Sequence, residues 1–127
     1  MLIIDANAIL RYLLYDNENM AKEVNKLILN NKVSVRYEVL AEVIYVLEKV
    51  YSMQRNVIAD SVKAFLNLPN IETETKEVLY SALETYTNRK LDFVDCLLYG
   101  FKTICGYDVF TFDRKLKELI VNTKTEI

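Results

Sequence analysis

The sequence predicts a helix-rich α/β fold, a three-layer α/β/α sandwich around a mainly parallel central sheet, in one domain spanning residues 1–127. Short apolar runs that suit buried strands alternate with longer stretches of helical periodicity, and this alternation is typical of parallel α/β folds. Hydrophobic residues make up 52% of the chain, which contains only two Gly and one Pro. This composition favours a packed globular domain over a loop-rich or disordered chain.

The first half of the chain alternates strand and helix patterns. Its expected elements are a strand at 2–5 (LIID), helices at 6–15 and 19–31, a strand at 33–35 and a long helix at 37–51. Apolar residues three or four positions apart mark the buried face of each helix. The inward residues expected from this spacing are Ile9, Leu10, Leu13 and Leu14, then Val24, Leu27 and Ile28, then Leu40, Val43, Ile44 and Leu47.

The second half continues the alternation. Its expected elements are a helix at 56–68 stopped by Pro69, a strand at 71–73, helices at 75–88 and 92–105, a strand at 107–112 (YDVFTF), a helix at 113–120 and an edge strand at 124–127. Thr75 suits the cap of one helix, and Gly106 suits the end of another. The face expected to be buried in the helix at 92–105 consists of Val94, Leu97, Leu98, Phe101 and Cys105.

Composition limits the chemistry that the protein can perform. The chain has no His, which excludes His-based triads and His-containing metal sites, and its two Cys cannot form a four-Cys zinc site. A site built from carboxylates alone suits hard ions such as Mg²⁺ or Mn²⁺. The net charge of −2 weakens the case for a general nucleic-acid binder without excluding a nucleic-acid enzyme.

Two features favour a cytoplasmic protein without a membrane segment. No apolar run approaches the roughly 18–20 residues that span a bilayer, and the N-terminus lacks a signal-like pattern. Cys96 and Cys105 lie nine positions apart on one expected helix, about 13 Å at the usual helical rise, which is too far for a disulfide. We therefore expect both to be reduced residues of the core.

Acidic residues recur where the expected strands end and where neighbouring helices begin. Asp5 and Asp113 close two expected strands, and the carboxyl ends of parallel strands form the usual ligand-binding edge. Asp95, with Asp92 beside it, starts a helix that returns toward this edge, and Glu42 lies early in the helix after the strand at 33–35. Carboxylates gathered in this way repel one another, and a divalent cation would relieve the repulsion.

Each acid also has a purely structural interpretation. Asp5 and Asp113 suit helix caps as well as they suit ligands, and for Asp92 the cap is the favoured interpretation. Periodicity alone places Glu42 away from the buried stripe of its helix, as a solvated surface residue. Asn7 is either a local hydrogen-bonding residue or one that orients a neighbouring carboxylate.

Four motifs together resemble the PIN domain family, and within it the VapC type, the ribonuclease toxin of toxin–antitoxin pairs. They are an apolar strand ending in Asp-x-Asn, a Glu on the third helix, the helix start D-F-x-D-x-L-L and the late run T-F-D-R, and they cover nearly the whole chain in order. Cys96, Tyr99 and Gly100 replace the residues more usual at their positions, and we interpret these replacements as packing changes.

The resemblance implies metal-dependent hydrolysis of RNA with one or two Mg²⁺ or Mn²⁺ ions. The acidic quartet of the family falls on Asp5, Glu42, Asp95 and Asp113. It implies supporting roles for Asn7, Asp92 and Thr111. It also implies a homodimer and a cognate antitoxin as partner. Contact with substrate phosphates is a further possibility for Arg11, Arg114 and Lys115, although solvated surface charge is the more ordinary role for each.

Four alternatives stay open at this point. A PIN nuclease of RNA processing shares the same motifs. A signalling receiver domain has this length and pattern, but its paired acids after the first strand are missing here. A phosphohydrolase with an Asp nucleophile needs Asp-x-Asp, and Asn7 stands at the second Asp position. A non-catalytic interaction module is the fourth alternative.

Overall fold

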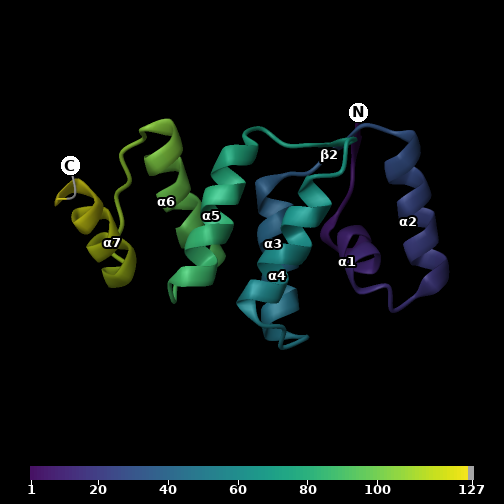
Figure 1. The fold of residues 1–127 in the computed structure, drawn as a ribbon, viewed down its shortest axis with the longest axis horizontal. Helices are drawn as coiled ribbons and strands as arrows, with labels where there is room; N and C mark the ends of the chain where they lie inside the picture. The colour runs from purple at the N-terminus through teal and green to yellow at the C-terminus, as the bar shows by residue number, and fades with distance from the viewer. Residues whose placement is uncertain (126–127) are drawn as a thin grey trace. The chain divides into compact units, whose positions relative to one another are not determined.

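The computed structural model describes residues 1–125 of the chain. The chain divides into two compact units, the N-terminal unit Met1–Lys76 and the C-terminal unit Glu77–Ile127, whose elements are drawn in Figure 1. Among the described residues, no helix combines the length and the apolar character needed to cross a lipid bilayer.

A parallel sheet lies in the N-terminal unit. Its strands are β1 (Leu2–Ile3), β2 (Val33–Ser34) and β3 (Ile71–Glu72), ordered β1-β2-β3. Leu2 is paired with Val33, and Val33 with Ile71, so the strands are in one register along the sheet. This sheet and the abundance of helices confirm the predicted helix-rich α/β class, although each strand is shorter than the apolar run that predicted it.

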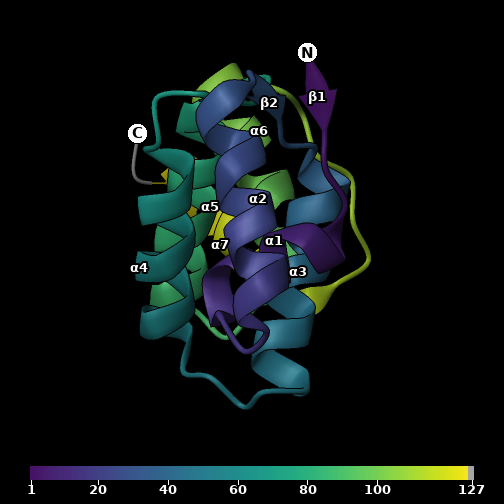
Figure 2. The same ribbon diagram turned by 90° about the vertical axis from the view of Figure 1, so that its right-hand side faces the viewer.

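Four helices accompany this sheet. They are α1 (Ala6–Leu14), α2 (Glu18–Asn30), α3 (Tyr37–Lys49) and α4 (Arg55–Leu66), and Figure 2 looks onto α2 with the other three around it. The predicted stripe of α3 is completely buried, from Leu40 to Leu47. The prediction that Leu27 faces the core was wrong. Leu27 is 40% exposed, because the buried face of α2 is centred on Ala21, Val24 and Ile28.

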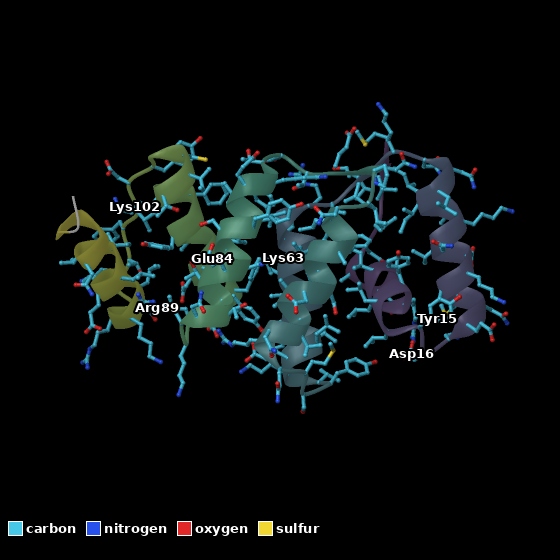
Figure 3. All side chains as sticks on the ribbon, viewed as in Figure 1. Tyr15, Asp16, Lys63, Glu84, Arg89 and Lys102 are labelled. Carbon is cyan, nitrogen blue, oxygen red and sulfur yellow. The ribbon has the colours of Figure 1, made fainter. Side chains whose placement is uncertain are left out.

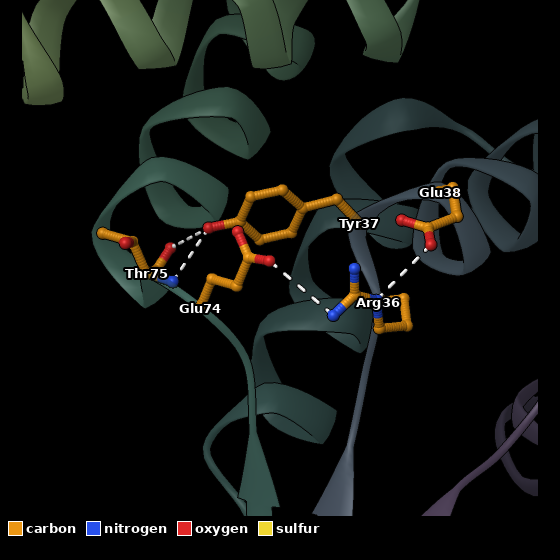
Figure 4. Close-up of polar contacts among 5 residues, drawn as sticks. All are labelled: Arg36, Tyr37, Glu38, Glu74 and Thr75. Atoms are coloured by element: carbon orange, nitrogen blue, oxygen red, sulfur yellow. Dashed lines mark hydrogen bonds and ion pairs between the residues drawn. The ribbon is translucent and has the colours of Figure 1, made fainter.

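Polar contacts tie the ends of β2 and β3 together (Figure 4). The Tyr37 hydroxyl donates a hydrogen bond to the Thr75 carbonyl oxygen at 2.9 Å and accepts one from the Thr75 amide at 2.8 Å. Arg36 forms ion pairs with Glu38 at 3.4 Å and with Glu74 at 3.6 Å. At the carboxyl edge of β2 and β3, one positive charge therefore lies between two carboxylates.

The helix α5 (Lys76–Asn88) begins at the boundary, and α6 (Phe93–Cys105) and α7 (Arg114–Thr125) complete the C-terminal unit. Gly100 permits close packing of α6 against α5, because a Cβ there would lie 3.0 Å from the Val78 carbonyl oxygen. Tyr86 and Phe93 meet edge to face with ring centroids 5.9 Å apart. Gly106, with φ 75°, ends α6 as predicted.

Two predictions for α6 were wrong. Val94 is 54% exposed and Cys105 is exposed, so neither belongs to the core, whereas Cys96 is buried. The buried face instead consists of Phe93, Cys96, Leu97 and Gly100. The helix is apolar on several sides, and periodicity therefore could not identify the face that packs.

The two strands predicted near the C-terminus are also wrong where the structure describes them. Residues 107–112 form neither a helix nor a strand, and no other described segment pairs with their backbone. Aromatic residues favour strands, but a segment rich in them forms a strand only when it can pair with another strand in a sheet. The helix α7 continues through Thr125, so residues 124–125 are helical, while residues 126–127 of the predicted edge strand lie outside the described residues.

Candidate active site

Three acidic residues of the C-terminal unit line one surface hollow of about 400 Å³. Asp92 and Asp95 come from the start of α6, and Asp113 immediately precedes α7. We call this the acidic hollow, and its lining residues are Lys90, Leu91, Asp92, Asp95, Asp113, Arg114 and Lys115. The D-F-x-D and T-F-D-R motifs, which are separate in the sequence, therefore come together in the structure.

The acids of the hollow affect one another electrostatically. Partial burial raises the pKa of Asp95, and the charges of Asp113 and Asp92 raise it further. Each of these causes disfavours the ionised form of Asp95. A perturbed carboxyl group in a hollow with two like charges is typical of a functional site, although structural clusters show it as well.

Asp92 lies at the N-cap position of α6, as predicted, but its side chain makes no capping hydrogen bond. Its backbone carbonyl oxygen accepts the hydrogen bond from Cys96 N at 3.1 Å that begins the helix. The favoured interpretation of Asp92 as a side-chain cap is therefore wrong, because its carboxylate accepts no hydrogen bond from the first turn of α6. This carboxylate remains available to the hollow.

Asp113 is positioned by its neighbours in the chain. Its Oδ1 accepts a hydrogen bond from the Leu116 amide at 2.9 Å, which is the helix-starting role that the sequence predicted. Its own amide donates to the Thr111 hydroxyl oxygen at 3.0 Å. Thr111 thus supports the backbone that carries Asp113 into the acidic hollow.

The other predicted site residues belong to the N-terminal unit. Asp5 follows β1 and caps α1, with its Oδ1 accepting a hydrogen bond from the Ala8 amide at 2.9 Å. Glu42 is exposed on α3, as periodicity predicted, and Asn7 is exposed in the first turn of α1. Arg11 pairs with Asp16 at 3.2 Å, so its charge already has a partner.

The donor chemistry of the acidic hollow suits a hard divalent cation. Carboxylate oxygens are the preferred ligands of Mg²⁺ and Mn²⁺. Burial is the largest cause of the raised pKa of Asp95, and repulsion by Asp113 and Asp92, which a cation would relieve, adds to it. Within the described residues, no three acidic or Cys side chains are spaced as a ready-made metal site. Joint action of all four predicted acids therefore stays a prediction.

A second hollow of about 190 Å³ was missed by sequence reasoning. We call it the basic hollow, and its lining residues are Arg89, Lys90, Leu91, Lys115, Glu118, Leu119 and Asn122. It shares Lys90, Leu91 and Lys115 with the acidic hollow. The available signal was the pair Arg89–Lys90, which Leu91 separates from the D-F-x-D motif.

Comparison with known proteins identifies the family. The PIN domain family matches residues 2–121 of the chain. This chain belongs to the PIN domain family. The family prediction made from the four motifs is thus confirmed, and the match includes every predicted site residue.

This PIN domain is also similar in sequence to a bacterial ribonuclease. The VapC ribonuclease of Aquifex aeolicus (strain VF5) is 33% identical to it over 89 residues, which are 69% of this chain and 66% of the relative. The match therefore spans slightly less than two thirds of the length of that relative. No solved structure matches the chain significantly.

Proposed function

We propose that this PIN domain is a metal-dependent endoribonuclease and the toxin of a type II toxin–antitoxin pair. The observation that carries the proposal is the acidic hollow, in which partial burial, and then the charges of Asp113 and Asp92, raise the pKa of Asp95. The similarity to a protein named VapC ribonuclease supports the choice of RNA as substrate. The absence of His in the chain is consistent with this reading, since metal-independent cleavage by paired His side chains is not available.

The proposed site consists of the four acids of the family pattern. Asp5, Asp95 and Asp113 would hold one or two Mg²⁺ or Mn²⁺ ions, directly or through water, and Glu42 would bind a second ion or orient the attacking water. When bound, the ion lowers the pKa of water and offsets negative charge at the phosphorus. Asn7, Asp92 and Thr111 support the acids, and the Thr111 bond to the Asp113 amide illustrates how.

Basic residues beside the acids are proposed to hold the RNA backbone. Arg114 and Lys115 line the acidic hollow, where a substrate phosphate would meet them. Arg11 is the weaker candidate of the three, because its guanidinium is paired with Asp16. Contact of these residues with phosphate would position the strand without selecting its sequence.

The proposal includes a cognate antitoxin, a homodimer and a cytoplasmic location. A neighbouring gene for a small DNA-binding protein would support the toxin assignment. Its absence would favour the second candidate, a PIN nuclease of RNA processing, because both candidates use the same acids.

Cleavage of a mixed pool of single-stranded RNA in the presence of Mn²⁺ tests the proposal. We expect cleavage by the natural protein and a loss of at least about 100-fold in Asp5→Asn and Asp95→Asn, since even residues that only orient metal ligands contribute about 10- to 100-fold. Glu84→Gln is the matched control, because Glu84 is an exposed acid of α5 (Figure 3) that lines neither the acidic nor the basic hollow.

The control variant should cleave like the natural protein. Absence of Mn²⁺-dependent cleavage would contradict the proposal. So would cleavage that survives both substitutions, because it would come from another site or from a contaminating nuclease.

A further inference from the structure

We propose that the basic hollow is a phosphate-binding subsite that holds the RNA backbone next to the cleaved bond, through Arg89, Lys90 and Lys115. The inference rests on the proposed nuclease function and extends it to residues outside the family pattern. It gives the bound strand a path, from the acidic hollow, where the bond is cut, into the basic hollow.

Continuity of the two hollows is the first argument. Lys90, Leu91 and Lys115 line both of them, so a strand that occupies one lies against the wall of the other. A polynucleotide has phosphates on both sides of the bond that is cut, and these flanking phosphates need places on the enzyme. The basic hollow is directly adjacent to the acids and provides such a place.

The two hollows differ in charge, as expected for an RNA strand whose flanking phosphates bind beside the acidic hollow. The basic hollow has three positive side chains, Arg89, Lys90 and Lys115, against one negative side chain, Glu118. The acidic hollow contains three carboxylates, which repel phosphate until a cation is bound. Flanking phosphates are therefore attracted to the basic hollow, and Lys and Arg contacts of this kind supply most sequence-independent affinity for nucleic acids.

The backbone that carries Arg89 and Lys90 is well anchored. The Arg89 amide donates to the Thr85 carbonyl oxygen at 2.8 Å at the end of α5, and the side chain of Leu91 is buried. Lys115 Nζ donates to the Lys90 carbonyl oxygen at 3.4 Å, which connects the α5–α6 loop to α7. A subsite held by three elements in this way needs little rearrangement when a ligand binds.

Binding of a fluorescent eight-nucleotide single-stranded RNA to the Asp95→Asn protein tests the inference without cleavage. We compare Arg89→Gln/Lys90→Gln with Lys102→Gln/Lys117→Gln, a control that removes the same charge from the same unit. Lys102 and Lys117 line neither hollow, and Figure 3 shows Lys102 on α6 and Arg89 at the end of α5. Binding is measured over a range of salt concentrations.

We expect the Arg89/Lys90 variant to bind RNA roughly tenfold more weakly and to lose about 1.4 from the slope of log K against log salt, or about 0.7 for each lost phosphate contact. The control should keep the slope of the parent protein. Equal effects in the two variants, or no effect in either, would overturn the inference.

Cleavage of the same RNA by the natural protein separates this inference from the proposed function. RNA binding with the expected difference but no Mn²⁺-dependent cleavage would leave the subsite standing and contradict the nuclease. Cleavage together with equal slopes in the two variants would keep the nuclease and reject the subsite.

Discussion

Two arginines of the N-terminal unit form ion pairs with nearby acids, whereas the acids of the acidic hollow form none among the described residues. Arg36 lies between Glu38 and Glu74, and Arg11 pairs with Asp16. Among the described residues, no ion pair joins Asp92, Asp95 or Asp113 to a Lys or Arg side chain, although Lys90, Arg114 and Lys115 line the same hollow. These ion pairs of the N-terminal unit stabilise local structure, whereas the carboxylates of the hollow have, among these residues, no ion-paired side chain to offset their mutual repulsion.

The pKa shifts in the two regions have opposite signs. The pKa of Glu38 is lowered, mainly by a backbone hydrogen bond and also by Arg36, while burial and two like charges raise the pKa of Asp95. A lowered pKa means that the fold stabilises the ionised carboxylate, and a raised pKa means that the fold destabilises it. Carboxyl groups whose ionised form is destabilised in a hollow are the better candidates for function.

The largest expected effect is stabilisation by metal. At a Mn²⁺ concentration about 100 times its dissociation constant, the free energy of unfolding should rise by about 2.7 kcal/mol, or on the order of 10 °C in Tm. Calorimetry with and without Mn²⁺ measures this rise. Asp95→Asn should abolish most of it, because the substitution removes a charged oxygen ligand.

Glu38→Gln is the control for the metal experiment, since it changes an exposed acid of the N-terminal unit that is paired with Arg36. It should keep the full rise. An equal rise in Asp95→Asn would show that the metal binds elsewhere and would remove the functional contrast between the regions.

An intermediate effect is expected where the N-terminal unit uses its polar groups for structure. Tyr37→Phe leaves the Thr75 amide and carbonyl without the hydroxyl partner and should lower the free energy of unfolding by about 1–2 kcal/mol. Urea denaturation measures the change. Tyr45→Phe is the matched control, because Tyr45 is exposed on the same helix and should change stability by less than about 0.5 kcal/mol.

The response to Mn²⁺ should survive Tyr37→Phe. A variant that folds but no longer responds to the ion would mean that this polar contact belongs to the metal site. The contrast between a structural and a functional region would then fail.

The smallest expected effect is on the pH dependence of stability in the metal-free protein. Asp95 binds its proton more tightly when folded, so its contribution to stability is greatest below the unfolded pKa and falls as pH rises toward the folded pKa. The contribution of Glu38 has the opposite sign: it is present above the unfolded pKa and is lost as pH falls through the folded pKa.

Unfolding free energies from about pH 3 to about pH 7 measure these contributions. Relative to the natural protein, Asp95→Asn should gain stability as pH rises, and Glu38→Gln should lose it. Parallel curves for the two variants would contradict the contrast between the regions.

The helices were the most predictable part of the fold. The residues Leu40, Val43, Ile44 and Leu47 are buried as predicted, because polar residues occupy the other side of that helix and leave only one face to pack. Periodicity failed for the helix containing Val94, which is apolar on several sides. The strand predicted at 107–112 failed because strand formation depends on a partner that the local sequence does not specify.

The sequence identified candidate residues for the site, but it could not predict their hydrogen bonds or their arrangement in space. The sequence offered helix capping as one of two roles for Asp5 and Asp113, and both residues cap helices, because capping depends on residues only a few positions away. It could not show that Asp92 lies at a cap position without making the cap hydrogen bond, since a side-chain rotation decides this. The basic hollow depends on contact between the α5–α6 loop and α7, which are far apart in the chain.

The two capping acids have a genetic consequence. Asp5 and Asp113 each cap a helix through Oδ1, and Asn caps about as well as Asp. Under the proposed toxin function, an Asn allele at either position would remove the negative charge and keep the helix start, and a host would tolerate it as a folded protein without the activity. An Ala allele would lose the helix start as well, and its harmlessness would not distinguish lost chemistry from lost folding.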